Sequence, residues 1–173
     1  MKKRSINAFT LPEVMVSMAV FAVIMALVGM ILRGGQEQAQ LASLKMNLQE
    51  SVRESLYRMA LEIRESSPSR VTVGSGGSTL TFQIPANISN SGVITWSAPI
   101  TFQRGGNGTQ LIRIGGGQTT ILANDIQSVT FAATGAPIQT IVFLVTAQRT
   151  MTNGRAVPAV PLAMTGEARL RNP

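Results

Sequence analysis

The chain lacks cysteine and histidine altogether. Without cysteine it can form neither a disulfide nor a thiolate metal site, and its compartment cannot be inferred from redox chemistry. Any exported domain of this chain must therefore be held together by its apolar core alone.

Acidic residues are scarce beyond residue 66, where only Asp125 and Glu167 occur. An enzyme needs a nucleophile with a base, or a set of metal ligands, and these residues supply neither. Asp125 alone cannot provide the several oxygen ligands of a calcium site. Gly115-Gly116-Gly117 lacks the GKS/T sequence and the helix of a phosphate loop, so we interpret it as a turn between strands. We predict no enzyme activity, no catalytic residues, no metal and no cofactor.

Positive charge is abundant but unevenly placed. The 173 residues, enough for one domain with appendages, carry a formal net charge of +7. Lys2, Lys3 and Arg4 give residues 1–8 a charge of +3, while residues 33–66 sum to zero. Residues 67–173 carry +5 and Glu13 contributes the remaining −1. The basic N-terminus and the basic C-terminal part are thus separate features.

The longest apolar run extends from Val14 to Leu32, 19 residues without a charge. At about 1.5 Å per residue, a helix of this length approaches the roughly 30 Å thickness of the bilayer core. Basic residues before the run, with only Arg33 just after it, place the N-terminus in the cytoplasm. We predict a single membrane-spanning helix and export of the remaining chain.

Two ordinary explanations of this segment fit poorly. A secretory signal ends in a small-x-small cleavage site after its apolar run, whereas here the sequence Met30-Ile31-Leu32-Arg33-Gly34-Gly35 follows. A plain signal anchor fits the hydrophobicity but leaves Glu13 unexplained, because a carboxylate at mid-membrane costs about 2.5–3.5 kcal/mol. Its place near the cytoplasmic edge lowers that cost without removing it.

The segment Ala8-Phe9-Thr10-Leu11-Pro12-Glu13-Val14 resembles the processing motif of type IV prepilins and pseudopilins. The resemblance implies cleavage after Ala8 by a prepilin peptidase on the cytoplasmic side, followed by N-methylation of Phe9. Ala8 stands where that family usually has glycine. The resemblance also implies that Glu13 pairs with the terminal amine of a neighbouring subunit during assembly.

A local explanation of Glu13 also stays open. A carboxylate in the first turn of a helix is attracted by the positive end of the helix dipole and needs no partner. Pro12 fits both explanations, because the first N–H groups of a helix lack an intrahelical acceptor.

The helix is predicted to continue through residues 33–66. Apolar side chains recur there with the 3.6-residue period of an amphipathic helix, at Leu41, Leu44, Leu48, Val52, Leu56, Met59 and Ile63. Glu54, Arg58 and Glu62 are spaced for an i,i+4 ladder on the outer face, and Pro68 marks the end. Gly34-Gly35 indicates either a soft point in the helix or a membrane-exit loop.

From Arg70 onward, alternation and turn residues predict β-structure. The candidate strands are Thr79–Ile84, Val93–Trp96, Ile100–Arg104, Gln110–Ile114, Thr119–Leu122, Ile126–Ala132, Ile138–Ala147 and a last strand near Ala168–Leu170. Gly105-Gly106-Asn107-Gly108 predicts a hairpin and Asn153-Gly154 another turn. Pro158 and Pro161 restrict their stretch to an edge or a loop.

We predict an α+β fold in which a long N-terminal helix, membrane-spanning in its first half, packs on one antiparallel β-sheet. Its parts are a leader (1–8), a transmembrane and filament-core helix (9–32), an amphipathic extension (33–66) and a β-rich head (67–173). The resemblance to type IV pilins implies the same architecture, a long helix packed on an antiparallel sheet. Arg58–Arg64 and the ending Leu170-Arg171-Asn172 are similar to J-type minor pseudopilins and their pilus counterparts.

The predicted function is therefore a structural, minor subunit of a type IV pilus or a type II secretion pseudopilus. The resemblance implies other pilins, a prepilin peptidase, an assembly platform and lipid of the bacterial cytoplasmic membrane as partners, with the head periplasmic or extracellular. The alternative is a DNA-binding minor pilin of a DNA-uptake filament. DNA binding favours clustered basic residues with stacking aromatics, whereas the seven arginines of the head are dispersed along the sequence. We do not expect nucleic acid as a partner.

Overall fold

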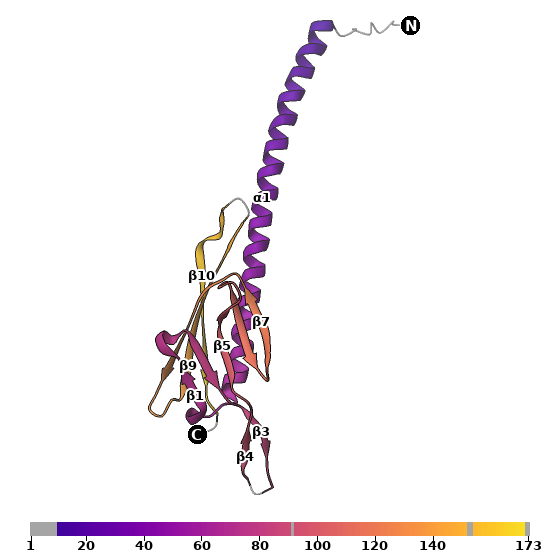
Figure 1. Ribbon diagram of the computed structural model, residues 1–173. Helices are drawn as coiled ribbons and strands as arrows, with labels where there is room; N and C mark the ends of the chain where they lie inside the picture. The colour runs from indigo at the N-terminus through magenta and orange to yellow at the C-terminus, as the bar shows by residue number, and fades with distance from the viewer. Residues whose placement is uncertain (1–9, 91, 152–153, 172–173) are drawn as a thin grey trace. The chain divides into compact units, whose positions relative to one another are not determined.

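The computed structural model describes residues 10–90, 92–151 and 154–171 (Figure 1). The chain divides into two compact units, Met1–Ala42 and Ser43–Pro173. The described part of the first unit is almost entirely helical. The second unit contains the rest of the helix and all of the strands, which is the α+β, pilin-like architecture predicted from the sequence.

The helix α1 runs from Leu11 to Arg64 and comprises 54 residues. It passes through Gly34 and Gly35 without interruption, so the alternative of a membrane-exit loop at this position is wrong. A glycine weakens a helix by about 1 kcal/mol relative to alanine. Two glycines within so long a helix are tolerated here.

The strands form three antiparallel sheets instead of the single sheet expected. The first has the order β1 (Val71–Val73), β2 (Thr79–Phe82), β5 (Ile100–Gly105), β6 (Gln110–Gly115) and β7 (Gln118–Asn124). The second has the order β10 (Ala156–Arg169), β9 (Thr140–Thr150) and β8 (Ile126–Thr134). The third is a hairpin of β3 (Pro85–Ile88) and β4 (Ile94–Trp96). Two short 3-10 helices, η1 (Pro68–Arg70) and η2 (Ser75–Gly77), lie beside β1 in the sequence.

Most predicted strands are confirmed within a few residues, and so are the turns at 105–108 and 115–117. The last strand is longer than expected, since β10 includes both Pro158 and Pro161. As predicted for that stretch, β10 is an edge strand. Its pairing with β9 shifts register between Val157 and Leu162, and this shift accommodates the prolines because they lack the N–H that a ladder requires.

The core of the second unit lies between the C-terminal part of α1 and the two larger sheets. From α1 it receives Leu48, Val52, Leu56, Met59 and Ile63, the buried part of the predicted stripe. From the sheets it receives four phenylalanines and several aliphatic side chains. The rings of Phe82 and Phe102, for example, lie 5.2 Å apart. The amphipathic pattern thus correctly identified the face of α1 that packs on strands.

Side chains and backbone of other elements contact the ends and edges of the two larger sheets. Ser55 of α1 is fully buried, and its hydroxyl lies 3.0 Å from the carbonyl oxygen of Leu122 on the edge strand β7. Just beyond β10, the N–H of Arg171 donates to the carbonyl oxygen of Arg64, the last residue of α1. The Ser55 contact covers a group of an edge strand that would otherwise be available to other chains, and the Arg171 contact joins the segment after β10 to the end of α1.

The edge of β8 is approached by η2 at Gly77. Gly77 has φ +70°, and a Cβ atom there would lie 2.6 Å from the carbonyl oxygen of Phe131 on β8. The backbone of η2 can come this close only because residue 77 has no side chain.

Gly77→Ala is therefore expected to lower the free energy of unfolding by about 2–4 kcal/mol, from the positive φ and from overpacking. Gly76→Ala is the matched control, since Gly76 has φ +69° and open space around its Cβ position. It should lose only about 1–2 kcal/mol. Urea unfolding of the full-length protein in detergent measures both, and equal losses would show that the approach to Phe131 is unimportant.

Candidate functional site

The N-terminal candidate site begins at the first turn of α1. The carbonyl oxygen of Thr10 accepts hydrogen bonds from the N–H groups of Glu13 and Val14, at 3.0 and 3.2 Å. Glu13 thus lies in the first helical turn, as both explanations of this carboxylate require. Ala8 and Phe9, the predicted cleavage junction, lie outside the described residues.

The side chain of Glu13 is exposed on the surface of the helix. Its backbone carbonyl oxygen accepts a hydrogen bond of 2.8 Å from the Ser17 hydroxyl, which satisfies the most polar side chain of the apolar run by local back-bonding. The Glu13 side chain is exposed and has no hydrogen-bond or ionic partner among the described residues. The pairing explanation therefore requires a partner outside the described residues, and the local explanation requires none.

The helix that follows Glu13 is apolar on all sides. By length and composition, the N-terminal part of α1 is able to cross a membrane, and none of the qualifying stretch is buried by the chain itself. A hollow on one side of this helix is lined by Val14, Ser17, Met18, Phe21 and Ala22. Because residues four apart share a helix face, this hollow adjoins the face that carries Glu13. These features together support a membrane-anchored chain.

Within the second unit, the structure corrects the predicted ion pairs of α1. Arg58 pairs with Glu54 at 2.5 Å, as expected from the i,i+4 spacing. Glu62 does not continue this ladder. Instead both of its carboxylate oxygens accept from the Nε–H of Arg113 on β6, at 3.0 and 2.8 Å. Both side chains of this pair are mostly buried, so the pair attaches α1 to the five-stranded sheet.

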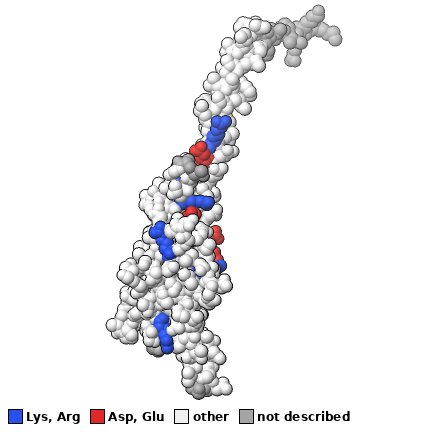
Figure 2. Space-filling view, in the orientation of Figure 1, with Lys and Arg blue, Asp and Glu red and all other residues white. Residues whose placement is uncertain are grey.

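Other arginines of the head are also engaged. The guanidinium of Arg70 lies 5.4 Å from the centre of the Trp96 ring and donates to the Gln83 side chain. Arg149 lies 3.8 Å from the Asp125 carboxylate. On the face drawn in Figure 2, the described basic residues are dispersed, some of them beside acidic residues, and do not form one continuous patch. Nothing in this distribution favours the DNA-binding alternative.

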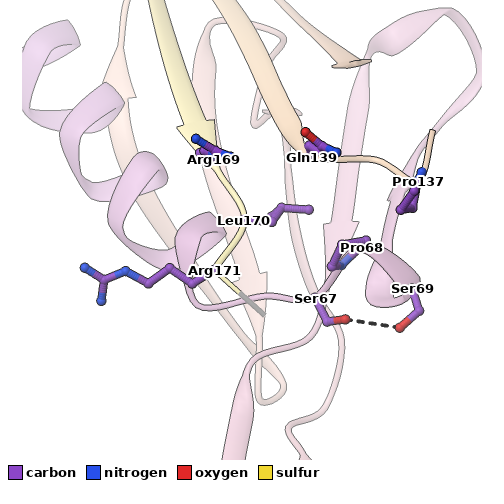
Figure 3. A pocket seen from close by; sticks show the side chains of 8 residues that line it. All are labelled: Ser67, Pro68, Ser69, Pro137, Gln139, Arg169, Leu170 and Arg171. Atoms are coloured by element: carbon purple, nitrogen blue, oxygen red, sulfur yellow. Dashed lines mark hydrogen bonds between the residues drawn. The ribbon is translucent and has the colours of Figure 1, made fainter. Parts of the chain in front are cut away.

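The two segments that resemble J-type pseudopilins meet at the C-terminal end of α1, through the hydrogen bond from Arg171 to Arg64 described above. Beside this junction lies a pocket of about 510 Å³ (Figure 3), lined by Ser67, Pro68, Ser69, Pro137, Gln139, Arg169, Leu170 and Arg171. The Leu170 side chain points toward Pro68 and Pro137, whereas that of Arg171 points away from them. Asn172, the last residue of the resemblance, lies outside the described residues.

The described residues contain no group of three or more aspartate and glutamate side chains arranged to hold a metal ion. Sequence reasoning also missed two features of the head, the partner of Glu62 and the complete β3–β4 hairpin. No sequence signal identified Arg113 as the partner, because it lies 51 residues away in the chain. For the hairpin, a strand at Val93–Trp96 was predicted and β4 confirms it, but β3 was not predicted, since it begins with a proline.

Comparison with known proteins yields one finding. No curated protein and no solved structure matches this chain. Residues 3–29 match the family described as "Prokaryotic N-terminal methylation motif". The matched segment includes Ala8, Phe9 and Glu13 and most of the apolar run. This match supports a type IV prepilin or pseudopilin, a pilin-like chain with an N-terminal transmembrane helix.

Proposed function

We propose that this chain is a structural subunit of a type IV pilus or a type II secretion pseudopilus. The observation that carries the proposal is Glu13, an exposed carboxylate without a described partner, at the start of an apolar helix and within the methylation motif. The proposal includes cleavage after Ala8 by a prepilin peptidase and N-methylation of Phe9.

In the proposed assembly step, subunits leave the cytoplasmic membrane as their apolar helices pack together. The amine of Phe9 on an incoming subunit then lies beside Glu13 of a neighbour. Each charge would be costly alone in an apolar environment, but a close pair offsets much of that cost. Because the pair forms only at one axial offset of the two helices, it helps to set their register.

The proposed partners are other pilins or pseudopilins of the same filament, the peptidase, the assembly platform and lipid of the bacterial cytoplasmic membrane. Before assembly the chain is a single-pass membrane protein with its N-terminus in the cytoplasm. The charge distribution around the apolar run supports this orientation. Its head is periplasmic, or extracellular once assembled.

We further infer that the subunit is a minor one. A major subunit contacts copies of itself along the whole filament, so residues 67–173, with a charge of +5, would be stacked against like charge. Screening over about 8–10 Å weakens this repulsion but leaves it at touching surfaces. Among different subunits the same charge can meet acidic partners. The J-like segments Arg58–Arg64 and Leu170–Asn172 support the same inference.

Mass spectrometry of sheared surface filaments tests the proposal. The experiment uses cells that express the full-length chain with its neighbouring filament genes and a prepilin peptidase. The chain is expected in the filament fraction, shortened by eight residues and beginning with N-methylated Phe9. As a minor subunit it should be present in trace amounts relative to the most abundant subunit.

Each part of the proposal can fail separately. Cleavage after Leu32, or an uncleaved chain, would contradict processing at Ala8. A processed chain that never enters the filament fraction would contradict the filament function. Amounts equal to the most abundant subunit would contradict the minor role alone.

A further inference from the structure

The β3–β4 hairpin is the most isolated part of the described head. β3 pairs only with β4, so both outer edges of this two-stranded sheet are unpaired among the described residues. In Figure 1 the hairpin projects beyond the other strands of the second unit. A two-stranded hairpin on its own is marginally stable in water, so this one gains stability if another surface covers it.

The hairpin exposes aliphatic side chains. Ile88 and Ile94 lie opposite each other in the register, so their side chains share one face. Ile88 is 62% exposed, Ile94 37% and the adjacent Val93 64%. Single exposed aliphatic residues are common on proteins, but the Ile88–Ile94 pair, with Val93 beside it at the turn, makes the end of this projecting element apolar.

The charge pattern restricts what this surface can contact. No charged residue occurs between Arg70 and Arg104, although the chain carries a net charge of +7. The hairpin therefore contributes no charge from its own strands, and Arg70 lies at its base, beside Trp96. The hairpin fits an uncharged, apolar protein surface, with free strand edges that offer backbone hydrogen bonds.

The base of the hairpin is held firmly by the head. The N–H of Ser97 donates to the Ile84 carbonyl oxygen at 2.8 Å, and the Ile84 N–H reaches the Ser97 hydroxyl at 3.2 Å. The Gln83 side chain donates to the Ser97 carbonyl oxygen at 2.8 Å. Arg70 lies over the ring of Trp96, the last residue of β4. The apolar surface is thus presented in a defined position, which lowers the entropy lost on contact.

We propose that the β3–β4 hairpin docks onto the head of a neighbouring subunit in the filament. Its strands have only four and three residues, whereas each side of a stable interface contributes roughly 20–30 residues. So small a surface cannot hold two free proteins together. It suffices where another contact already holds them, and packing of the apolar helices in a filament is such a contact. This inference rests on the proposed function.

The absence of cysteine makes a direct test simple, because one introduced cysteine is the only thiol of this chain to which a probe can attach. Val93→Cys places it on the hairpin. Val160→Cys is the matched control, a valine of β10 that is 76% exposed. Each full-length variant is expressed with the other filament subunits, labelled with benzophenone maleimide in sheared filaments and irradiated, and its adducts are identified by mass spectrometry. Val93→Cys should join predominantly to the head of another filament subunit, and Val160→Cys should give much less of this adduct.

A second pair of variants measures the contribution of the contact. Val93→Lys should lower recovery of the chain in sheared filaments by about tenfold, because docking would bury an unpaired charge. Val160→Lys should leave recovery unchanged. Equal adducts or equal recoveries for the two sites, with the wild-type chain present in filaments, would overturn docking by the hairpin. Absence of the wild-type chain from filaments would instead overturn the proposed function, and with it this partner.

Discussion

Glu13→Ala is expected to lower recovery of the chain in sheared filaments by about 100-fold while leaving membrane insertion and cleavage intact. Removing one partner of a buried ion pair costs about 3–5 kcal/mol because the other charge remains unpaired, and the lower end of that range corresponds to somewhat more than about 100-fold. In the proposed filament, the unpaired charge would be the methylated amine of Phe9. Insertion depends on the apolar run itself, which the substitution lengthens by one residue.

Two further variants separate this pairing from the local explanation of Glu13. Glu13→Gln keeps the shape of the side chain and removes its charge. The pairing hypothesis predicts a similar loss of recovery, whereas interaction with the helix dipole is worth only about 0.3–1 kcal/mol. Glu37→Ala removes an exposed carboxylate of α1 beyond the apolar run and should have no effect. Normal incorporation of Glu13→Ala beside the native subunits would refute the pairing.

Met59→Ala is expected to lower the free energy of unfolding by about 2–5 kcal/mol. Met59 is 0% exposed and belongs to the core between α1 and the sheets. Truncating it removes apolar contacts and leaves a cavity that close-packed neighbours cannot fill completely. The size of the loss therefore reports how firmly the C-terminal part of α1 is attached to the strands.

Met46→Ala is the matched control, since it makes the same change in the same helix. Met46 is 66% exposed, so its replacement should change stability by no more than about 0.5 kcal/mol. Urea unfolding of the full-length protein in detergent, followed by fluorescence of Trp96, measures both variants, because Trp96 is the only tryptophan. Equal losses would mean that the predicted face of α1 does not form the core.

The functional segment was largely readable from the sequence because its signals are local. The basic leader, the Ala8-Phe9 junction, Glu13 and the apolar run lie within the first 32 residues. A family match over residues 3–29 supports the same interpretation. Cleavage at Ala8, methylation of Phe9 and pairing of Glu13 remain predictions. Each concerns an encounter with another molecule, which a single chain does not contain.

Much of the fold was also accessible to sequence reasoning. The 3.6-residue stripe identified the buried face of α1, because helical periodicity depends only on near neighbours. The hairpin between β5 and β6 followed from its glycine-rich turn, since such a turn itself sets the pairing of its two strands. β3 was missed because a short strand that begins with Pro85 carries almost no periodic signal.

By itself, the sequence of this protein determined the apolar run, the processing motif, the amphipathic helix and most strand positions, all of which depend on residues close together in the chain. Only the tertiary structure decided that the strands divide into three sheets, that Glu62 pairs with Arg113, and that β10 continues through its prolines at a sheet edge. The physical reason is that these features arise from contacts between distant segments. An ion-pair partner, or the division of strands among sheets, is selected by the packing of the whole core, and no local pattern encodes it.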